Sequence, residues 1–257
     1  MLPQNNSFKY QERIVAFIDI MGFEKIIQNT EKSEERLNEI CVAINYINTY
    51  FKDIKDNNFQ DGAFEITQFS DSIIISVPMK ESLQMISIFE HLKNIQIYLL
   101  FKGILLRGGI VKGKLIHNNN MLLGPGMNKA YSLESKCAFY PRIVIEPKVL
   151  WQFARSNGND GLYKLKDYDY HKTFVKENDG TSFIDYFNDV EHYLNTINET
   201  VHSYFKQLCL ITQSNIDSDD ISIKMKYLWF REKIRASEYY LKNKTLFREL
   251  ITNRNKK

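Results

Sequence analysis

The sequence predicts an α+β fold, in which helices pack on one face of a mostly antiparallel sheet. Two observations favour this class. Nearly unbroken apolar, β-prone segments alternate with longer segments of helical periodicity. Two of the β-prone segments are separated by a tight turn, which predicts a hairpin. With 257 residues, 44% of them hydrophobic, the chain can form a substantial core.

Each predicted element carries a local signal. The first strand contains a continuous apolar run from Ile14 that ends at Asp19. The long second helix repeats apolar residues at helical spacing from Leu37 to Phe51, and Pro78 ends the hairpin. The predicted elements are strand 12–20, helices 22–29 and 33–55, strands 63–70 and 72–77, helix 80–102, strand 104–117, helix 127–136 and strand 140–146.

The order strand, helix, strand, strand, helix, strand is that of a ferredoxin-like βαββαβ core. In this topology the first strand neighbours the hairpin, so Asp19 and Asp71 are predicted to meet at one end of the sheet. We expect the core to span residues 10–150. Residues 151–257 are expected to form a mixed and then helical extension, packed on the core or at a subunit interface. Within it the sequence predicts a loop at 156–161, a strand at 182–187 and helices at 190–212 and 218–252.

The composition excludes several classes of protein. A formal net charge of +3 is too small to favour nucleic acid or a membrane surface as a partner. Cys41, Cys137 and Cys209 lie far apart without the spacing of a zinc site, which suits a reducing compartment. The first residues lack the apolar run of a signal peptide, and the longest apolar stretch, 95–106, is too short to span a bilayer. We therefore expect a cytoplasmic protein with no membrane or nucleic-acid partner.

Two acidic residues carry the chemical prediction. Asp19 alone could merely cap the helix that follows it. Asp19 and Asp71 together, at the ends of neighbouring buried strands, are costly unless positive charge lies between them. Mg²⁺ or Mn²⁺ is usually held by one or two carboxylates and by substrate phosphates. The amides of Met21, Gly22 and Phe23 open a helix directly after Asp19, where a helix N-terminus favours phosphate.

Four segments resemble the successive signatures of the class III nucleotidyl cyclases. They are Phe17–Phe23, Phe69–Asp71 in the predicted hairpin, Arg107–Gly113 and Gly124–Ala130. The resemblance covers roughly residues 10–150 of this chain. Their order and spacing make it more specific than any one motif.

The resemblance implies a set of roles. Asp19 and Asp71, assisted by the Ile20 carbonyl, would hold two Mn²⁺ or Mg²⁺ ions. Asn128 of the partner subunit would orient the ribose in a site built across a homodimer. A 3′-hydroxyl would attack the α-phosphate of a nucleoside triphosphate and expel pyrophosphate. Residues placed at the substrate are Phe17, Met21, Gly22, Phe23, Thr67 and Met121.

The chain departs from the adenylate cyclase pattern at three positions. Thr67 and Met121 stand where adenylate cyclases carry their purine-reading residues, and Ser132 stands where they carry an arginine that stabilises the transition state. The stabilising cation must therefore come from elsewhere. The catalytic candidates are Arg107 and Lys129, followed by Arg142, and each could instead be an ordinary surface charge.

Three further stretches resemble the Pycsar pyrimidine cyclases of bacterial anti-phage systems: residues 106–110, 130–134 and 140–145. This resemblance implies cyclic UMP or cyclic CMP as the product, with UTP favoured over CTP as the substrate. It also implies a separate effector protein that the product activates.

Other functions stay open. A purine cyclase of the same class is the nearest alternative. A diguanylate cyclase would need a Gly-Gly-Asp/Glu-Glu-Phe turn, whereas this hairpin carries Phe69-Ser70-Asp71-Ser72. A non-catalytic ferredoxin-like module that binds nucleotide or RNA would need exposed aromatic residues on central strands and a basic face. The predicted central strands are instead aliphatic and acidic.

Overall fold

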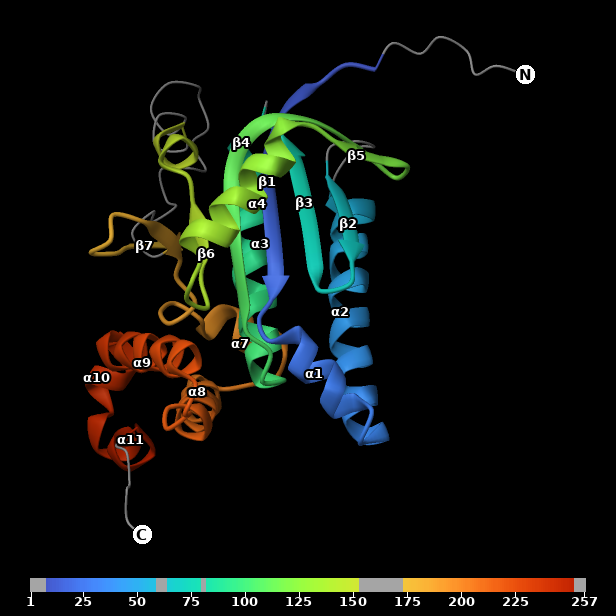
Figure 1. Ribbon diagram of the computed structural model, residues 1–257. Helices are drawn as coiled ribbons and strands as arrows, with labels where there is room; N and C mark the ends of the chain where they lie inside the picture. Colours follow the sequence, from blue (N-terminus) through green and yellow to red (C-terminus); the bar gives the residue numbers. More distant parts are fainter. Residues whose placement is uncertain (1–7, 59–63, 80–81, 153–172, 252–257) are drawn as a thin grey trace.

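An eight-stranded sheet organises the chain (Figure 1). The computed structural model describes residues 8–58, 64–79, 82–152 and 173–251. The strand order is β2-β3-β1-β4-β6-β8-β7, with β5 paired to β4 outside this path. The strands are β1 Gln11–Ile20, β2 Glu65–Phe69, β3 Ser72–Pro78, β4 Leu106–Asn118, β5 Met121–Leu123, β6 Ile143–Ile145, β7 Phe174–Lys176 and β8 Ser182–Ile184.

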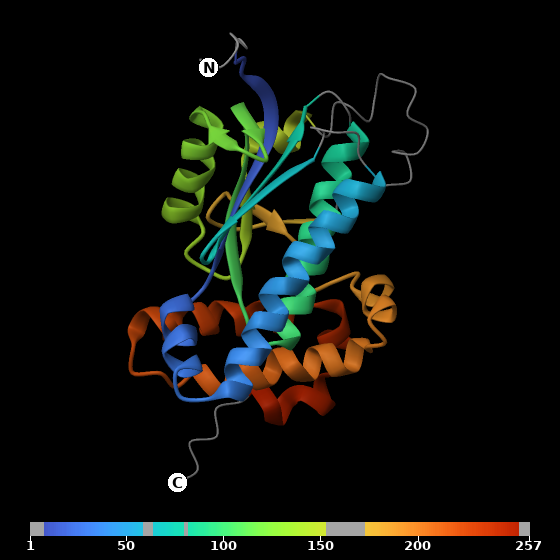
Figure 2. The same ribbon diagram turned by 90° about the vertical axis from the view of Figure 1, so that its right-hand side faces the viewer.

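Helices cover both faces of this sheet. α2 and α3 lie on one face and α4 on the other, while the helices of the C-terminal extension gather below the sheet (Figures 1 and 2). The helices are α1 Phe23–Thr30, α2 Glu34–Asn58, α3 Ser82–Phe101, α4 Pro125–Cys137, α7 Glu191–Thr196, α8 Val201–Asn215, α9 Ile221–Ala236, α10 Glu238–Lys242 and α11 Lys244–Ile251. None of those in the described ranges is both long and apolar enough to cross a bilayer.

The predicted α+β class and the βαββαβ order are confirmed. The neighbours β2-β3-β1-β4 are all antiparallel, which is the ferredoxin-like arrangement. The prediction that helices occupy one face only is wrong, because α4 packs on the second face. Apolar side chains on that face, including Val15 and Val111, form a cluster with Ala130 of α4. Successive strand residues point to opposite faces, so β1 needs an apolar cover on each side.

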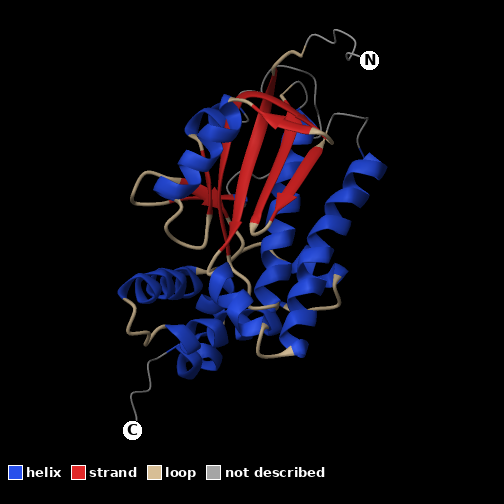
Figure 3. Cartoon of the chain, turned by 45° about the vertical axis from the view of Figure 1, so that its right-hand side comes forward, coloured by secondary structure: helices blue, strands red, loops and turns tan. Residues whose placement is uncertain are grey.

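The extension differs from its prediction in two ways. β8 pairs with β6 and β7 pairs with β8, so the extension continues the core sheet (Figure 3). Its long predicted helices are also broken. Thr200 and Ser203 form a capping box that starts α8 afresh, and Ser237 adopts an extended conformation between α9 and α10. The predicted loop at 156–161 lies outside the described residues.

The predicted strand at 140–146 is shorter than expected, and β6 covers Ile143–Ile145 alone. Pro141 lacks an amide proton, so it cannot donate to a sheet ladder. β6 joins the sheet parallel to β4, with Ile143 opposite Gly108. The strand is therefore a short continuation beyond the antiparallel core.

His91, a partly buried histidine of α3, is expected to make stability depend on pH. His91 of α3 accepts or donates a 2.9 Å hydrogen bond between its Nδ1 and the Tyr50 hydroxyl, and burial lowers the pKa of His91 from 6.5 to about 4. The unfolded chain therefore binds this proton at higher pH than the folded chain does. Its contribution to stability is complete above pH 6.5 and is lost as the pH falls toward 4.

We expect His91 to lower the free energy of unfolding by about 2 kcal/mol between pH 7 and pH 5. Urea unfolding at the two pH values measures this loss. His91→Gln, which cannot titrate, should remove most of that difference, whereas the matched change at the exposed His192 should keep it. An unchanged difference in His91→Gln contradicts the assignment.

Candidate active site

Asp19 and Asp71 lie side by side at one end of the sheet. Asp19 sits next to the last residue of β1, opposite Ser72 of β3 and Arg107 of β4. Asp71 forms the turn between β2 and β3, and its carbonyl accepts a 3.1 Å hydrogen bond from the Ile20 amide. Residues 52 positions apart are thus joined by the pairing of β1 with β3.

Arg107 and Glu134 complete the cluster. Nε of Arg107 donates a 2.9 Å hydrogen bond to Oδ2 of Asp19 and lies 2.8 Å from Oε1 of Glu134 in an ion pair. The Glu134 side chain is 2% exposed, against 15% for Asp19 and 32% for Arg107. One guanidinium therefore bridges a carboxylate of the sheet and a buried carboxylate of α4.

The carboxylates of this cluster carry more negative charge than Arg107 balances. Burial raises the pKa of Asp19, and the charge of Asp71 and a hydrogen bond between the two carboxyls raise it further, although Arg107 opposes the shift. Burial also raises the pKa of Glu134, where Arg107 again opposes and the charges of Asp19 and Asp71 add. Asp19 and Glu134 thus share one arginine, Asp71 adds a third negative charge nearby, and additional positive charge at this point would stabilise the cluster.

These residues fit a metal that is bound jointly with substrate. Among the described residues, no three His, Cys, Asp or Glu side chains form a cage that could hold an ion by themselves. Two carboxylates with substrate phosphates are the usual arrangement for Mg²⁺. Asp19, Asp71 and the Ile20 carbonyl have the hard oxygen donors that Mg²⁺ and Mn²⁺ prefer.

Glycines hold α4 against the sheet. A Cβ atom on Gly109 would lie 2.7 Å from the Ala130 carbonyl oxygen and 2.8 Å from the Glu134 amide nitrogen. A Cβ atom on Gly113 would lie 2.6 Å from Cα of Gly126. The glycines after Arg107 therefore let α4 approach β4 closely enough for Glu134 to reach the guanidinium.

The turn after β1 presents backbone amides. Gly22 adopts a left-handed conformation, with φ of 70° and ψ of 25°, and no side chain caps the first turn of α1. The Met21 amide donates a 2.8 Å hydrogen bond to the Leu105 carbonyl and is therefore not available to a phosphate. Of the predicted substrate residues here, Phe23 therefore brings a first-turn amide of α1, while the side chains of Phe23 and Met21 pack partly against the core.

The other predicted substrate residues lie farther across the same face. Phe17 is 6% exposed, and its ring meets the Tyr131 ring edge-on at 5.4 Å between centroids. Thr67 of β2 and Phe17 of β1 both pair with Ile74 of β3, which lies between them. Thr67 is therefore level with Phe17 across the sheet, two strands away. Two strand spacings and two residues separate Thr67 from Asp19, a distance of about 12 Å. Met121 begins β5 beside this region.

A chain of buried hydrogen bonds ends at Thr67. Nε of Arg13 donates to Oγ of Ser76 at 2.8 Å, Oγ of Ser76 lies 2.8 Å from Nδ1 of His117, and Nε2 of His117 lies 3.0 Å from Oγ1 of Thr67. Arginine can only donate, and the buried Ser76 hydroxyl needs an acceptor. In the His117 tautomer that has its proton on Nε2, Ser76 donates to His117 and His117 donates to Thr67. In that tautomer the Thr67 hydroxyl has its own proton for another acceptor.

The three candidate cations are separated. Of the three, Arg107 alone contacts one of the two aspartates, Asp19, in the described part of the chain. Nζ of Lys129 lies 2.6 Å from Oε1 of Glu146 and donates a hydrogen bond to the Lys112 carbonyl. Lys112 is five residues along β4 from Arg107, so Lys129 lies away from the aspartates. Arg142 is buried and pairs with Asp179 at 2.6 Å. Asn128, on the first turn of α4, is exposed to solvent.

Sequence reasoning missed Glu134, although a signal was present. Glu134 follows Ala130 by four residues, so the two share the face of a helix that turns toward the sheet. A single carboxylate on that apolar face requires a cationic partner below it. Arg13 and His117 gave no comparable signal, because their partners come from other strands.

Comparisons with known proteins find similar solved structures but no matching family. No protein-family model matches the chain, and no curated protein matches it. The adenylyl cyclase CyaB from P. aeruginosa aligns at 15% identity and a TM-score of 0.40, over 57% of this chain and 82% of that one. The catalytic core of a rhodopsin-guanylyl cyclase with converted specificity, solved with ATPαS, aligns at 17% identity and a TM-score of 0.42, over 68% and 95%.

A third solved structure is similar to the same extent. The monomeric guanylyl cyclase domain of the RhoGC fusion protein from the aquatic fungus Blastocladiella emersonii aligns at 18% identity and a TM-score of 0.42, over 68% of this chain and 94% of that one. Likenesses at this level say what the chain is similar to and do not establish an activity. The function has to be inferred from the side chains themselves.

Proposed function

We propose that the protein is a metal-dependent nucleotide cyclase of the class III type. The observation that carries this proposal is that Asp19 and Asp71 lie together at one end of the sheet, with Arg107 bonded to Asp19. The N-terminus of α1, which no side chain caps, follows directly after β1. Such a site brings together carboxylates for a divalent cation and donors for phosphate. The four sequence signatures resembling class III cyclases fall on these same elements.

Each residue has a task in this reaction. Asp19, Asp71 and the Ile20 carbonyl would hold Mn²⁺ or Mg²⁺. When bound, the metal supplies charge that stabilises the phosphates and lowers the pKa of the attacking 3′-hydroxyl. The first-turn amides of α1 receive a phosphate group, and Glu134 keeps Arg107 directed at the site. The O3′–phosphorus bond forms as the bond to pyrophosphate breaks, so catalysis rests on positioning and charge stabilisation.

A homodimer with composite sites is part of the proposal. Three large apolar side chains are exposed around the open sheet face: Phe69 at 79%, Leu123 at 54% and Tyr131 at 54%. Exposed apolar residues of this kind favour a protein interface. Asn128 is exposed on the same helix as Tyr131. A second copy over this face would let Asn128 of the partner subunit reach the ribose.

The base is proposed to be uracil. We propose that His117 has its proton on Nε2 and donates it to Thr67, so that the Thr67 hydroxyl is a donor toward the base. Uracil offers a carbonyl acceptor at its 4-position, where cytosine offers an amino donor, and adenine likewise carries an amino group. UTP is therefore favoured over CTP and ATP. GTP, whose O6 is also an acceptor, is the purine alternative that this chemistry allows.

The resemblance to the Pycsar cyclases extends the proposal to the cell. We propose that cyclic UMP acts in the cytoplasm as a second messenger, and that it activates a separate effector protein in anti-phage defence.

The function is tested by incubating the protein with Mn²⁺ and each of the four ribonucleoside triphosphates, and by identifying products by mass spectrometry. Cyclic UMP and pyrophosphate from UTP support the proposal. A purine product alone points to the purine alternative. Retention of single-stranded RNA without any cyclic product overturns the cyclase assignment and favours a binding module.

Thr67→Val should lower kcat/KM for UTP by about 10-fold, because it removes the hydroxyl proposed to donate to the base and its hydrogen bond with His117. Turnover of a poor substrate such as ATP should change less. Thr67→Ser keeps the hydroxyl and should retain most of the UTP activity. Equal losses on every nucleotide would assign Thr67 to folding instead of base selection.

A further inference from the structure

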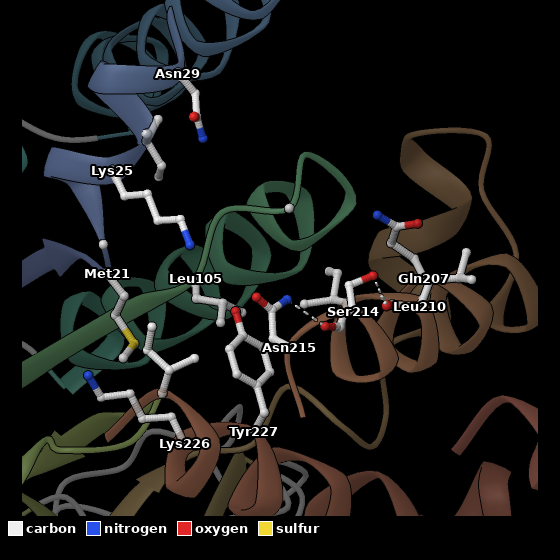
Figure 4. A pocket seen from close by; sticks show the side chains of 15 residues that line it. Met21, Lys25, Asn29, Leu105, Gln207, Leu210, Ser214, Asn215, Lys226 and Tyr227 are labelled. Atoms are coloured by element: carbon white, nitrogen blue, oxygen red, sulfur yellow. Dashed lines mark hydrogen bonds between the residues drawn. The ribbon is translucent and has the colours of Figure 1, made fainter. Parts of the chain in front are cut away.

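The turn that follows Asp19 also borders a cavity next to the C-terminal helices. A cavity of about 400 Å³ opens between α1, the start of β4 and the helices α8 and α9 (Figure 4). This volume suits a ligand of nucleotide size. Its walls combine apolar side chains, among them Ile26 and Ile211, with polar groups from three helices.

The charge of this cavity is one-sided. Lys25 enters from α1, and Lys226 and Tyr227 come from α9 on the opposite side (Figure 4). Among the described residues that line the cavity there is no aspartate or glutamate. A cavity lined by cations without compensating acids attracts anions.

The polar groups of the cavity are also available. Lys25, Asn29 and the Tyr227 hydroxyl form no hydrogen bond or ion pair between side chains in the described part of the chain. Lys226 lies over the Phe139 ring, with Nζ 5.3 Å from the ring centroid, and forms no ion pair with any residue that the structure describes. Asn215 donates to the Ile211 carbonyl and keeps its own amide oxygen free.

We propose that this cavity, which we call the Lys25–Lys226 pocket, binds a small phosphorylated ligand. The two ammonium groups and the Tyr227 hydroxyl would take the phosphate, and the apolar wall would take the body of the ligand. The binding part of this inference is independent of the proposed cyclase activity.

A ligand here would contact the residues that adjoin both strands of the active site. Met21 and Leu105 line the pocket and are joined by the 2.8 Å hydrogen bond between the Met21 amide and the Leu105 carbonyl. Met21 follows Asp19 by two residues, and Leu105 precedes Arg107 by two. We further infer that occupancy of the pocket changes the turnover number of the cyclase reaction. This part of the inference rests on the proposed function.

Calorimetry in EDTA separates the pocket from the metal-dependent site. Full-length protein is titrated with UMP, AMP and pyrophosphate, and we expect binding that weakens at least about 10-fold in Lys25→Met and Lys226→Met. Methionine keeps the length of the side chain and removes its charge. Lys224→Met, an exposed change on the same helix, should bind as the wild type does, and so should Asp71→Ala.

The outcomes distinguish the two sites and the two kinds of ligand. Binding of UMP or AMP but not pyrophosphate identifies a nucleotide, and binding of all three identifies phosphate as the main determinant. Loss of binding in Asp71→Ala, or no binding of any probe by the wild type up to about 10 mM, overturns the pocket. If binding holds but turnover does not respond to it, the coupling to the active site is wrong and the pocket stands.

Discussion

Asp71→Ala should lower the rate of cyclic nucleotide formation by at least about 100-fold while the protein stays folded. The change removes one of two neighbouring carboxylates, and Asp19 alone cannot both pair with Arg107 and hold the cation. The fold should survive because the bond that ties the turn to β1 uses the Asp71 carbonyl and not its side chain. Initial rates with Mn²⁺ and UTP, together with the circular dichroism spectrum, measure both effects.

A matched control separates a site effect from a general one. Asp53 is an exposed aspartate of α2, and Asp53→Ala should leave the rate unchanged. If Asp71→Ala keeps full activity, the turn carboxylate has no part in the reaction and the metal assignment falls with it.

Mixing two inactive variants should restore activity if the sites are composite. Asp71→Ala and Asn128→Ala each damage both sites of a homodimer, but in the mixed dimer one site receives both defects and the other receives none. Equal amounts with free subunit exchange should regain about a quarter of wild-type activity, because half of the dimers are mixed and half of their sites are intact. Rates before and after mixing measure the recovery.

The control for this experiment combines two lesions from the same half-site. Asp71→Ala mixed with Asp19→Ala should stay inactive, since each site then lacks one aspartate. Differently tagged subunits show whether mixed dimers form. If they form and the first mixture stays inactive, Asn128 and Asp71 do not serve one site from two subunits.

Several features followed from local sequence alone. The apolar run from Ile14 to Ile18 predicted a strand buried on both faces, and the tight turn at Asp71 predicted the hairpin. With the order of the elements, these were enough to predict that Asp19 and Asp71 meet. Chain topology decides which strand ends are neighbours, so two acids at such ends can be paired before any coordinates are known.

Other features depended on packing. Arg107 meets Glu134 because two glycines let α4 lie directly on β4, and the Lys25–Lys226 pocket exists because α8 and α9 fold back against α1. The predicted helix at 218–252 contains no strongly helix-breaking residue, yet the structure interrupts it at Ser237. The Ser237 side chain caps the N-terminus of α10 there.

The sequence by itself determined the strands, the hairpin and the meeting of the two aspartates, because apolar period and turn chemistry act over a few residues. Only the tertiary structure decided the partner of Arg107, the hydrogen-bond chain to Thr67 and the second pocket. These features bring together residues from separate elements, such as Thr67 with its hydrogen-bond partner His117, and Lys25 and Lys226 on two walls of the pocket. Their geometry follows from how whole helices pack on the sheet, and no local pattern records it.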